Sequence, residues 1–286
     1  MDDGVVFCFN NTMVPEQYKL VALWVIRGAL FIVPFIPLYI ASGLFFPFIT
    51  GKAFAFRVII EFAFAAWAWL VLVAPEYRPR KSYILFALLA FISILTLSTI
   101  FGENLTRSFW SNFERMEGLL THLHLVAYFL MLATVFERRH WVVFFNLFVI
   151  AGFFENSYVM FQHWGYIPSL QGITRVDGTI GNPTYLAAYL LFVVGFSLLL
   201  RFWFAKSPWR FWYDFMVAFS LVAMYFTASR GMSVGLLGGI VVFALIMLWP
   251  RTHHPLDVRY RFIAMGIFGA ALLCVGGLYA FRSSSF

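Results

Sequence analysis

Long apolar runs, separated by short polar or proline-rich stretches, follow one another along the whole chain. The runs cover residues 20–48, 54–74, 82–101, 118–136, 141–161, 184–204, 215–228, 231–249 and 262–281. A helix needs about 20 apolar residues to cross the roughly 30 Å of a bilayer core. The pattern therefore predicts an all-α fold, a polytopic transmembrane bundle of about nine helices. We expect residues 1–286 to form a single integral membrane domain with no soluble domain.

The composition agrees with this pattern. Of the 286 residues, 62% are hydrophobic and only 12% are charged, whereas soluble domains carry about 25% charged residues. The net charge of +7 comes from basic residues that stand singly or in short groups between the apolar runs. That arrangement is typical of topology signals, so we expect membrane lipids as partners and no nucleic acid. Cys8 and Cys274 lie at opposite ends of the chain and suggest no metal site.

The distribution of Lys and Arg predicts the orientation. About 13 of the 20 basic residues fall on one side of the predicted membrane, with groups at 78–81, 138–139 and 206–210. The positive-inside rule then places that side, and the N-terminus, in the cytoplasm. An odd number of spans puts the C-terminal Phe286 on the outer, periplasmic side. Residues 282–286 resemble the opening of an outer loop, so we expect the sequence to stop short of a further part of the protein.

The first of three unusual outer segments is residues 102–118, which lead into the fourth span. It is rich in charge, with Glu103, Arg107, Glu114, Arg115 and Glu117 in a short stretch. The alternative to a binding role is a solvated interfacial loop whose aromatic residues anchor it at headgroup depth.

The second outer segment is residues 174–185. Asn182 followed by Pro183 predicts a helix start, with Asn as the N-cap and Pro at the first helical position. Arg175 and Asp177 precede this start. Because a helix N-terminus presents free N–H groups and partial positive charge, the segment suits an anion. A simple cap and turn is the alternative, although it leaves Arg175 unexplained.

The third outer segment is residues 227–235, where one short span meets the next without a real loop. Ser229 and Arg230 lie there, at the membrane boundary. An ionisable residue at such depth is costly and therefore a functional candidate. The alternative for Arg230 is an ion pair with Glu155 or Asp177. The small residues that follow, at positions 231, 235 and 239, indicate close helix packing.

The predicted topology places all three segments on the same side of the membrane. Arg side chains pair well with phosphate oxygens, so the convergence suggests a lipid-linked phosphate or pyrophosphate. We expect the substrate-binding residues to be Arg175, Arg230, Arg115, Asp177, Asn182, Ser229 and Glu114, with no cofactor and no metal.

Polar residues within the spans receive simpler interpretations. Arg57 and Glu61 are four residues apart and are expected to pair with each other. His122 and His124 should point to different faces of a helix. Glu155, with the Asn that follows it, is a candidate for lining the same outer cavity.

Three motifs together carry a family resemblance. The runs RVDGTIGNPTYLAAY (175–189), TASRG (227–231) and FERMEGLL (113–120) resemble the O-antigen ligase and O-antigen polymerase superfamily. The resemblance implies transfer of a glycan from undecaprenyl pyrophosphate to a lipid, glycan or protein acceptor, at the periplasmic face of the bacterial inner membrane. It implies an inverting, metal-independent reaction in which Arg175 and Arg230 bind the pyrophosphate and stabilise it as it leaves.

The sequence departs from the family at its end. The large outer loop that carries the family's acceptor-activating histidine is expected beyond Phe286, so no catalytic residue is identified within the chain. We therefore expect these residues to hold the donor-binding half of the site and to be inactive alone. Two other readings stay open: a non-enzymatic flippase or transporter of a lipid-linked oligosaccharide, and a catalytically incomplete assembly subunit. A transporter favours charges at mid-membrane depth and repeated halves, and the sequence offers little of either.

Overall fold

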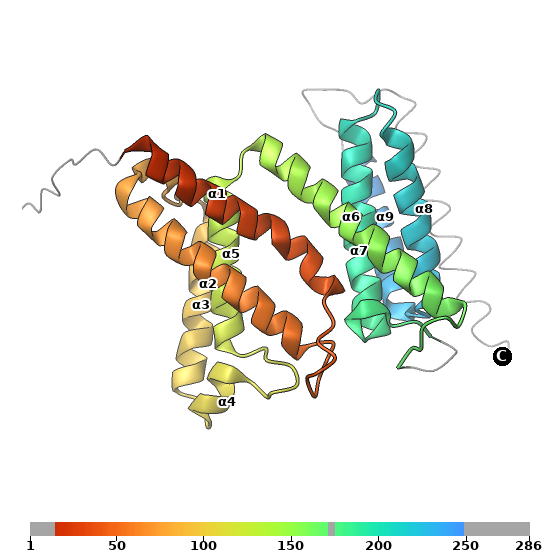
Figure 1. The fold of residues 1–286 in the computed structure, drawn as a ribbon, viewed down its shortest axis with the longest axis horizontal. Helices are drawn as coiled ribbons and strands as arrows, with labels where there is room; N and C mark the ends of the chain where they lie inside the picture. The colour runs from red at the N-terminus through yellow and green to blue at the C-terminus, as the bar shows by residue number, and fades with distance from the viewer. Residues whose placement is uncertain (1–14, 171–174, 249–286) are drawn as a thin grey trace, which may run out of the picture.

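The computed structural model describes residues 15–170 and 175–248, and within these ranges it contains helices and no strands (Figure 1). The α-helices and 3₁₀ helices, in chain order, are α1 (Glu16–Ile32), η1 (Val33–Leu38), α2 (Thr50–Val73), η2 (Pro75–Tyr77), α3 (Tyr83–Ile100), α4 (Leu105–Trp110), α5 (Leu119–Val135), α6 (Arg138–His163), η3 (Gly178–Ile180), α7 (Pro183–Trp203), α8 (Arg210–Phe226) and α9 (Arg230–Leu248). The predicted all-α fold is confirmed.

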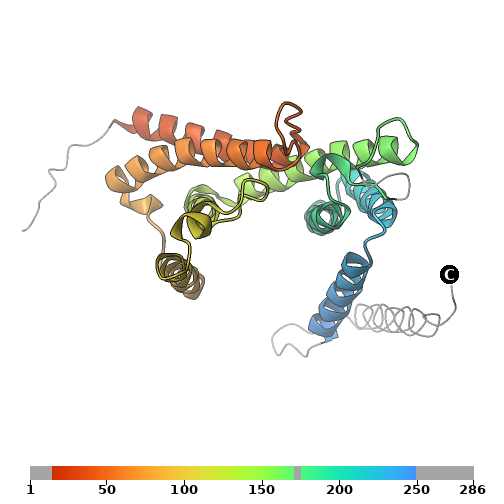
Figure 2. The ribbon, with the colours of Figure 1, turned by 90° about the horizontal axis from the view of Figure 1, so that it is seen from below.

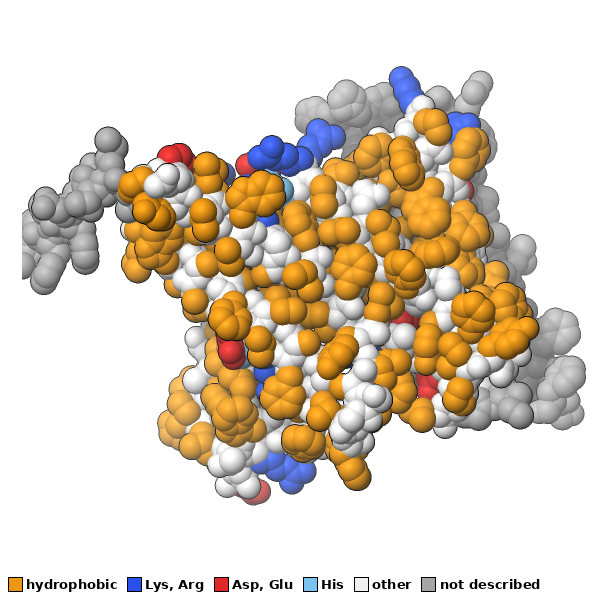
Figure 3. Space-filling model, in the orientation of Figure 1, with side chains coloured by type: hydrophobic (Ala, Val, Ile, Leu, Met, Phe, Trp, Pro, Cys, Tyr) orange, Lys and Arg blue, Asp and Glu red, His pale blue; other side chains and the backbone are white. Residues whose placement is uncertain are grey.

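Among the described residues, five helical segments are long and apolar enough to cross a membrane: Glu16–Leu38, Thr50–Val73, Tyr83–Ile100, Arg138–His163 and Pro183–Trp203. The helix α5 is apolar but shorter. Large hydrophobic side chains are exposed along these helices, as at Trp24 (77%), Phe62 (72%) and Leu72 (75%). Figure 3 shows such side chains over most of the visible face, with Lys and Arg gathered mainly at its upper and lower edges. This surface is that of a protein whose helices meet lipid.

The predicted spans coincide with helices from 54–74 through 231–249, with small shifts at their ends. The first predicted span, 20–48, extends too far. Its α-helix gives way at Val33 to a 3₁₀ helix that contains Pro34 and Pro37 and ends at Leu38. Proline lacks the N–H that an α-helix needs, which explains the early end. The prediction also missed α4, a short helix inside the segment 102–118.

The ninth predicted span, 262–281, lies outside the described residues, as do both chain termini. The structure therefore describes neither a ninth span nor the side on which each terminus lies. The helices that it does describe establish a multi-helix apolar bundle, and they give no orientation relative to a membrane.

Two cores hold the bundle together. One lies between α1, α2 and α5 and includes Ile26, Ile60 and Met131; the other lies between α6, α7 and α8 and includes Leu190 and Met216. The helix α6 runs from the first group to the second (Figure 1). Figure 2 shows α1, α2 and α6 extended along the long axis, with α3, α5 and α7 seen nearly end-on.

The connections that matter for the site gather at one end of the bundle, which we call the α4 end. There, η1, η3 and the first turn of α7 lie close together on the lower side of Figure 1, and the loop that follows α4 reaches the same cavity. The opposite end carries the α5–α6 and α7–α8 connections. The α4 end thus brings together segments that are far apart in the sequence.

Candidate functional site

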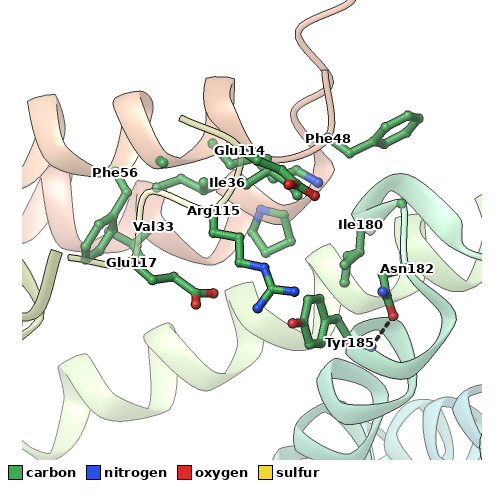
Figure 4. A pocket seen from close by; sticks show the side chains of 15 residues that line it. Val33, Ile36, Phe48, Phe56, Glu114, Arg115, Glu117, Ile180, Asn182 and Tyr185 are labelled. Carbon is green, nitrogen blue, oxygen red and sulfur yellow. Dashed lines mark hydrogen bonds between the residues drawn. The ribbon is translucent and has the colours of Figure 1, made fainter. Parts of the chain in front are cut away.

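A cavity of about 640 Å³ opens at the α4 end, between η1, the start of α2, the loop 111–118 and the turn that leads into α7. Most of its wall is apolar, formed by Val33, Ile36, Pro37, Phe48, Ile49, Ala53, Phe56 and Ile180. The polar lining consists of two cations, two carboxylates and two further polar side chains: Lys52, Arg115, Glu114, Glu117, Asn182 and Tyr185. Figure 4 shows the guanidinium group of Arg115 pointing across the cavity toward Tyr185.

The turn formed by η3 is built on a buried carboxylate. Glu155 of α6 is fully buried, and its Oε1 accepts a hydrogen bond from the backbone N–H of Thr179 at 2.8 Å. The hydroxyl of Thr179 donates to the second carboxylate oxygen, Oε2, and also lies 2.8 Å from the carbonyl oxygen of Pro37 in η1. Since a buried carboxylate must be hydrogen-bonded to be tolerated, these contacts fix the turn against α6 and η1.

Lys52 links the turn to α2. Its ammonium group donates to the carbonyl oxygen of Thr179 and lines the cavity. Lys52 is not among the binding residues predicted from the sequence. A signal was present, because a cation in the first turn of a helix opposes the helix dipole and needs a specific partner.

A second set of hydrogen bonds holds the start of the turn. The carboxylate of Asp177 accepts hydrogen bonds from the Gln162 side chain at 2.8 Å and from the backbone N–H of Leu170 at 3.0 Å. In return, the side-chain oxygen of Gln162, Oε1, accepts a hydrogen bond from the backbone N–H of Gly178 at 2.8 Å. Asp177 is only 1% exposed and does not line the cavity. Its contacts are those of a residue that shapes the turn. Its partner Gln162 was not among the residues predicted from the sequence.

Glycine is required at two positions of the turn. Gly178 has a φ of +60°, and a Cβ added there would lie 2.1 Å from Oε1 of Glu155. Gly181 has a φ of +76°, and its added Cβ would lie 2.6 Å from the side chain of Phe48. Left-handed backbone is costly for any residue with a Cβ. Both glycines therefore permit the close approach of the turn to α6 and to the cavity wall.

The predicted helix start at Asn182 is confirmed. Its side-chain oxygen accepts hydrogen bonds from the backbone N–H groups of Thr184 at 2.9 Å and Tyr185 at 3.3 Å, and Pro183 occupies the first helical position. This cap bears on the predicted anion site. The Asn182 side chain already accepts from the two N–H groups, and Pro183 has no N–H. An anion at this helix end would therefore interact with the helix dipole but would find no free backbone donors.

The loop 111–118 is anchored through its backbone. Arg57 of α2 is 5% exposed and donates to the carbonyl oxygen of Met116 at 2.8 Å and to the Thr121 hydroxyl at 2.6 Å. Arg57 and Glu61, which were expected to pair, interact only through their charges and form no hydrogen bond or ion pair with each other. Glu61 instead lies 3.0 Å from Nε2 of His124 on α5. The reason is that both side chains find partners across the α2–α5 contact, which a spacing rule for one helix does not consider.

The second and third sequence motifs meet directly. Arg175 donates through Nε to the carbonyl oxygen of Thr227 at 3.0 Å, and its Nη2 lies 3.4 Å from the Ser229 hydroxyl. That hydroxyl donates to the carbonyl oxygen of Pro183 at 3.1 Å. These bonds hold the α8–α9 junction against the first turn of α7. Neither Arg175 nor Ser229 lines the cavity.

Arg230 begins α9 and is exposed. The alternative of an ion pair with Glu155 or Asp177 is not seen, because both carboxylates bond within the turn. Glu155 does not line the cavity either, and Asn156 bonds to Ser220 of α8 at 2.9 Å.

The structure thus divides the candidate residues into two sets. Glu114, Arg115 and Asn182 share the cavity with Lys52, whereas Arg175, Asp177 and Ser229 hold the surrounding turns in place. No protein-family model, curated protein or solved structure matches the chain in the three comparisons made. The chemistry of the cavity must therefore be inferred from the residues that line it.

Proposed function

We propose that this chain binds a glycan carried on a polyprenyl pyrophosphate and forms the donor-binding part of a glycosyltransferase of the O-antigen ligase type. The observation that carries the proposal is the three-part lining of the cavity. Its apolar wall suits an isoprenoid chain, its two cations suit phosphate oxygens, and its two carboxylates suit the hydroxyl groups of a sugar. Few ligands other than a lipid-linked glycan phosphate combine all three groups.

Arg115 is the principal phosphate ligand in this proposal. Its guanidinium group points into the cavity and makes no hydrogen bond or ion pair with any residue that the structure describes, so its donors are available. Lys52 of α2 adds positive charge to the cavity while it holds the turn. Glu114 and Glu117 accept hydrogen bonds from sugar hydroxyls. A pyrophosphate leaving group gains most from such preorganised positive charge, because its own negative charge grows as the bond to the sugar breaks.

Arg175 takes a different role from the one that the resemblance implies. Its contacts to Thr227 and Ser229 support a positioning role, in which it fixes the α8–α9 junction that carries Arg230. Exposed at that junction, Arg230 is the second candidate for contact with the phosphate. Asp177 and Asn182 support the same turn from within.

The membrane arrangement is part of the proposal. Nine spans with a cytoplasmic N-terminus in the bacterial inner membrane would place the cavity at the periplasmic end. The concentration of Lys and Arg away from the α4 end supports this orientation. The acceptor in this proposal is a lipid, a glycan or a protein, and none of the described residues is assigned as the base that activates it.

The proposal is tested by binding measurements on the full-length protein in nanodiscs. Three ligands with the same isoprenoid chain are compared: a glycosylated pyrophosphate, the unglycosylated pyrophosphate and the free alcohol. We expect affinity to fall in that order, because the sugar and then the phosphates are removed. Equal affinity for the alcohol and the pyrophosphate would contradict the proposal.

A cellular measurement tests the activity. Arg115→Ala in the full-length protein is expected to reduce surface glycan attachment, whereas Arg107→Ala is not. Arg107 lies on α4 near the same loop but does not line the cavity, so it controls for a general loss of charge. Unchanged attachment with Arg115→Ala and Arg230→Ala combined would overturn the assignment.

A further inference from the structure

Two polar contacts cross the α2–α5 interface one helical turn apart. Arg57 bonds to Thr121, and Glu61 lies against His124. Glu61 sits midway along the 24-residue apolar helix α2, so its carboxyl group lies near the middle of a segment long enough to cross a membrane. Ionisable residues at this depth are rare in membrane proteins and usually functional. The proposed function leaves this pair without a role.

The hydrogen bonds of His124 determine how many protons the pair holds. Nδ1 lies 2.7 Å from the carbonyl oxygen of Leu120. A carbonyl oxygen only accepts, so Nδ1 must carry a hydrogen. Nε2 lies 3.0 Å from Oε1 of Glu61. A hydrogen bond at that distance needs one more proton between nitrogen and oxygen. Whether that proton sits on Glu61 or on His124, the pair as a whole is neutral.

The surroundings of the pair are apolar and open to lipid. A cavity of about 420 Å³ lies beside it, lined otherwise by Ile60, Phe64, Leu120, Leu123, Val126, Ala127 and Leu130. The Glu61 side chain is 63% exposed, whereas that of His124 is 9% exposed. Loss of the shared proton would leave the carboxylate of Glu61 facing hydrocarbon without a hydrogen bond from His124, which is unfavourable.

The charge of Arg57, one turn along α2, acts on Glu61, but the guanidinium group makes its hydrogen bonds to the carbonyl oxygen of Met116 and to Thr121. On α1, which packs against both helices, Lys19 pairs with Glu16 and Arg27 with Glu137. The helix α3, which packs on α5, has no Asp, Glu, Lys, Arg or His in its sequence. Tyr128, one turn beyond His124, packs on Phe56.

We propose that Glu61 and His124 form a proton-binding site that faces the lipid between α2 and α5. The site shares one proton between Nε2 of His124 and Oε1 of Glu61, and the adjacent cavity gives hydrophobic molecules access to the carboxyl group. This inference is independent of glycan binding, because the site contains no residue of the cavity at the α4 end.

A hydrophobic carbodiimide, dicyclohexylcarbodiimide, tests the proposal on the wild-type protein in nanodiscs. The reagent reacts with a protonated carboxyl group: the acid proton moves to one carbodiimide nitrogen, and a carboxyl oxygen bonds to the central carbon. The acyl group then migrates to nitrogen, so the stable product carries the full mass of the reagent. Peptide mass spectrometry locates it.

We expect Glu61 to be labelled at neutral pH at least roughly tenfold more than Glu103, because an ordinary aqueous Glu is almost fully ionised there. Glu103 is exposed between α3 and α4 and serves as the internal control. The variant Glu61→Gln should remove the label. Absence of label on Glu61, or equal label on Glu103, overturns the proposal.

Discussion

The loop 111–118 and the turn 175–182 both border the cavity at the α4 end, but they use their polar side chains in opposite ways. In the turn, Asp177, Thr179 and Asn182 all bond to the protein itself. In the loop, the side chains of Glu114 and Arg115 are exposed and make no hydrogen bond or ion pair with the described parts of the chain.

The difference teaches which segment is scaffold and which faces a ligand. The loop is held by its backbone, through the bond from Arg57 to the carbonyl oxygen of Met116, so its charged side chains remain available. The turn is held by its side chains, with Glu155 and Gln162 as buried partners. Mutations in the turn should therefore lower stability, and mutations in the loop should lower ligand affinity.

The largest expected effect is on stability, from Gly178→Ala in the turn. The new methyl group combines left-handed backbone strain with a clash against Glu155, for a cost of about 3 kcal/mol or more. Thermal unfolding in detergent, followed by tryptophan fluorescence, measures the loss.

Gly165→Ala is the matched control. Gly165 also has a positive φ, +80°, but nothing lies within 4 Å of an added Cβ. It should cost only the backbone strain, about 1–2 kcal/mol. Equal losses for the two variants would show that the close approach of the turn to Glu155 contributes nothing.

The next largest effect is on ligand affinity, from Arg115→Ala in the loop. Removing one charge-assisted contact to a phosphate should cost about 1.5–3 kcal/mol, which is roughly a 10- to 100-fold loss in affinity for the polyprenyl pyrophosphate. The unfolding temperature should not change, because Arg115 is exposed. A lowered unfolding temperature with unchanged affinity would reverse the roles assigned to loop and turn.

Arg175→Ala should cause a moderate loss of stability, in contrast to the loss of affinity expected for Arg115→Ala. The variant loses the bonds to the carbonyl oxygen of Thr227 and to Ser229, for about 1–2 kcal/mol of stability. Arg175→Lys keeps the charge but not the planar fork, so it should recover little of that loss. If Arg175→Lys restores ligand binding fully, Arg175 acts as a phosphate ligand through its charge and the positioning role is wrong.

The sequence predicted much of the fold, because apolar length alone locates membrane helices. It placed the helix start at Asn182 correctly, since the cap is a local signal. It extended the first span too far because apolar residues continue past Pro37 even though the helix does not. Hydropathy records where a chain can meet lipid, and proline decides where the α-helix ends.

The site was harder to predict, because its contacts join segments that lie far apart in the chain. Thr179 meets Lys52 and Glu155 across three different elements, and no spacing in the sequence brings these residues together. The same reason explains why Arg57 and Glu61 do not bond to each other, since each finds its hydrogen-bond partner on α5 or in the loop before it. Residue type identified Arg115 as a candidate, and only the fold separated it from Arg175.

The smallest expected effect concerns the helix caps. Asn182→Ala removes an acceptor for two N–H groups, at 2.9 and 3.3 Å, whereas Ser82→Ala removes an acceptor for one, at 3.1 Å from the N–H of Leu85. Each should cost about 1 kcal/mol in unfolding measurements, with the larger loss at Asn182. The Asn182 variant also frees donors at the edge of the cavity. If affinity for the pyrophosphate rises while stability falls, the cap competes with the ligand for the α7 N-terminus. Unchanged affinity would instead show that the phosphate lies nearer Arg115 than the helix end.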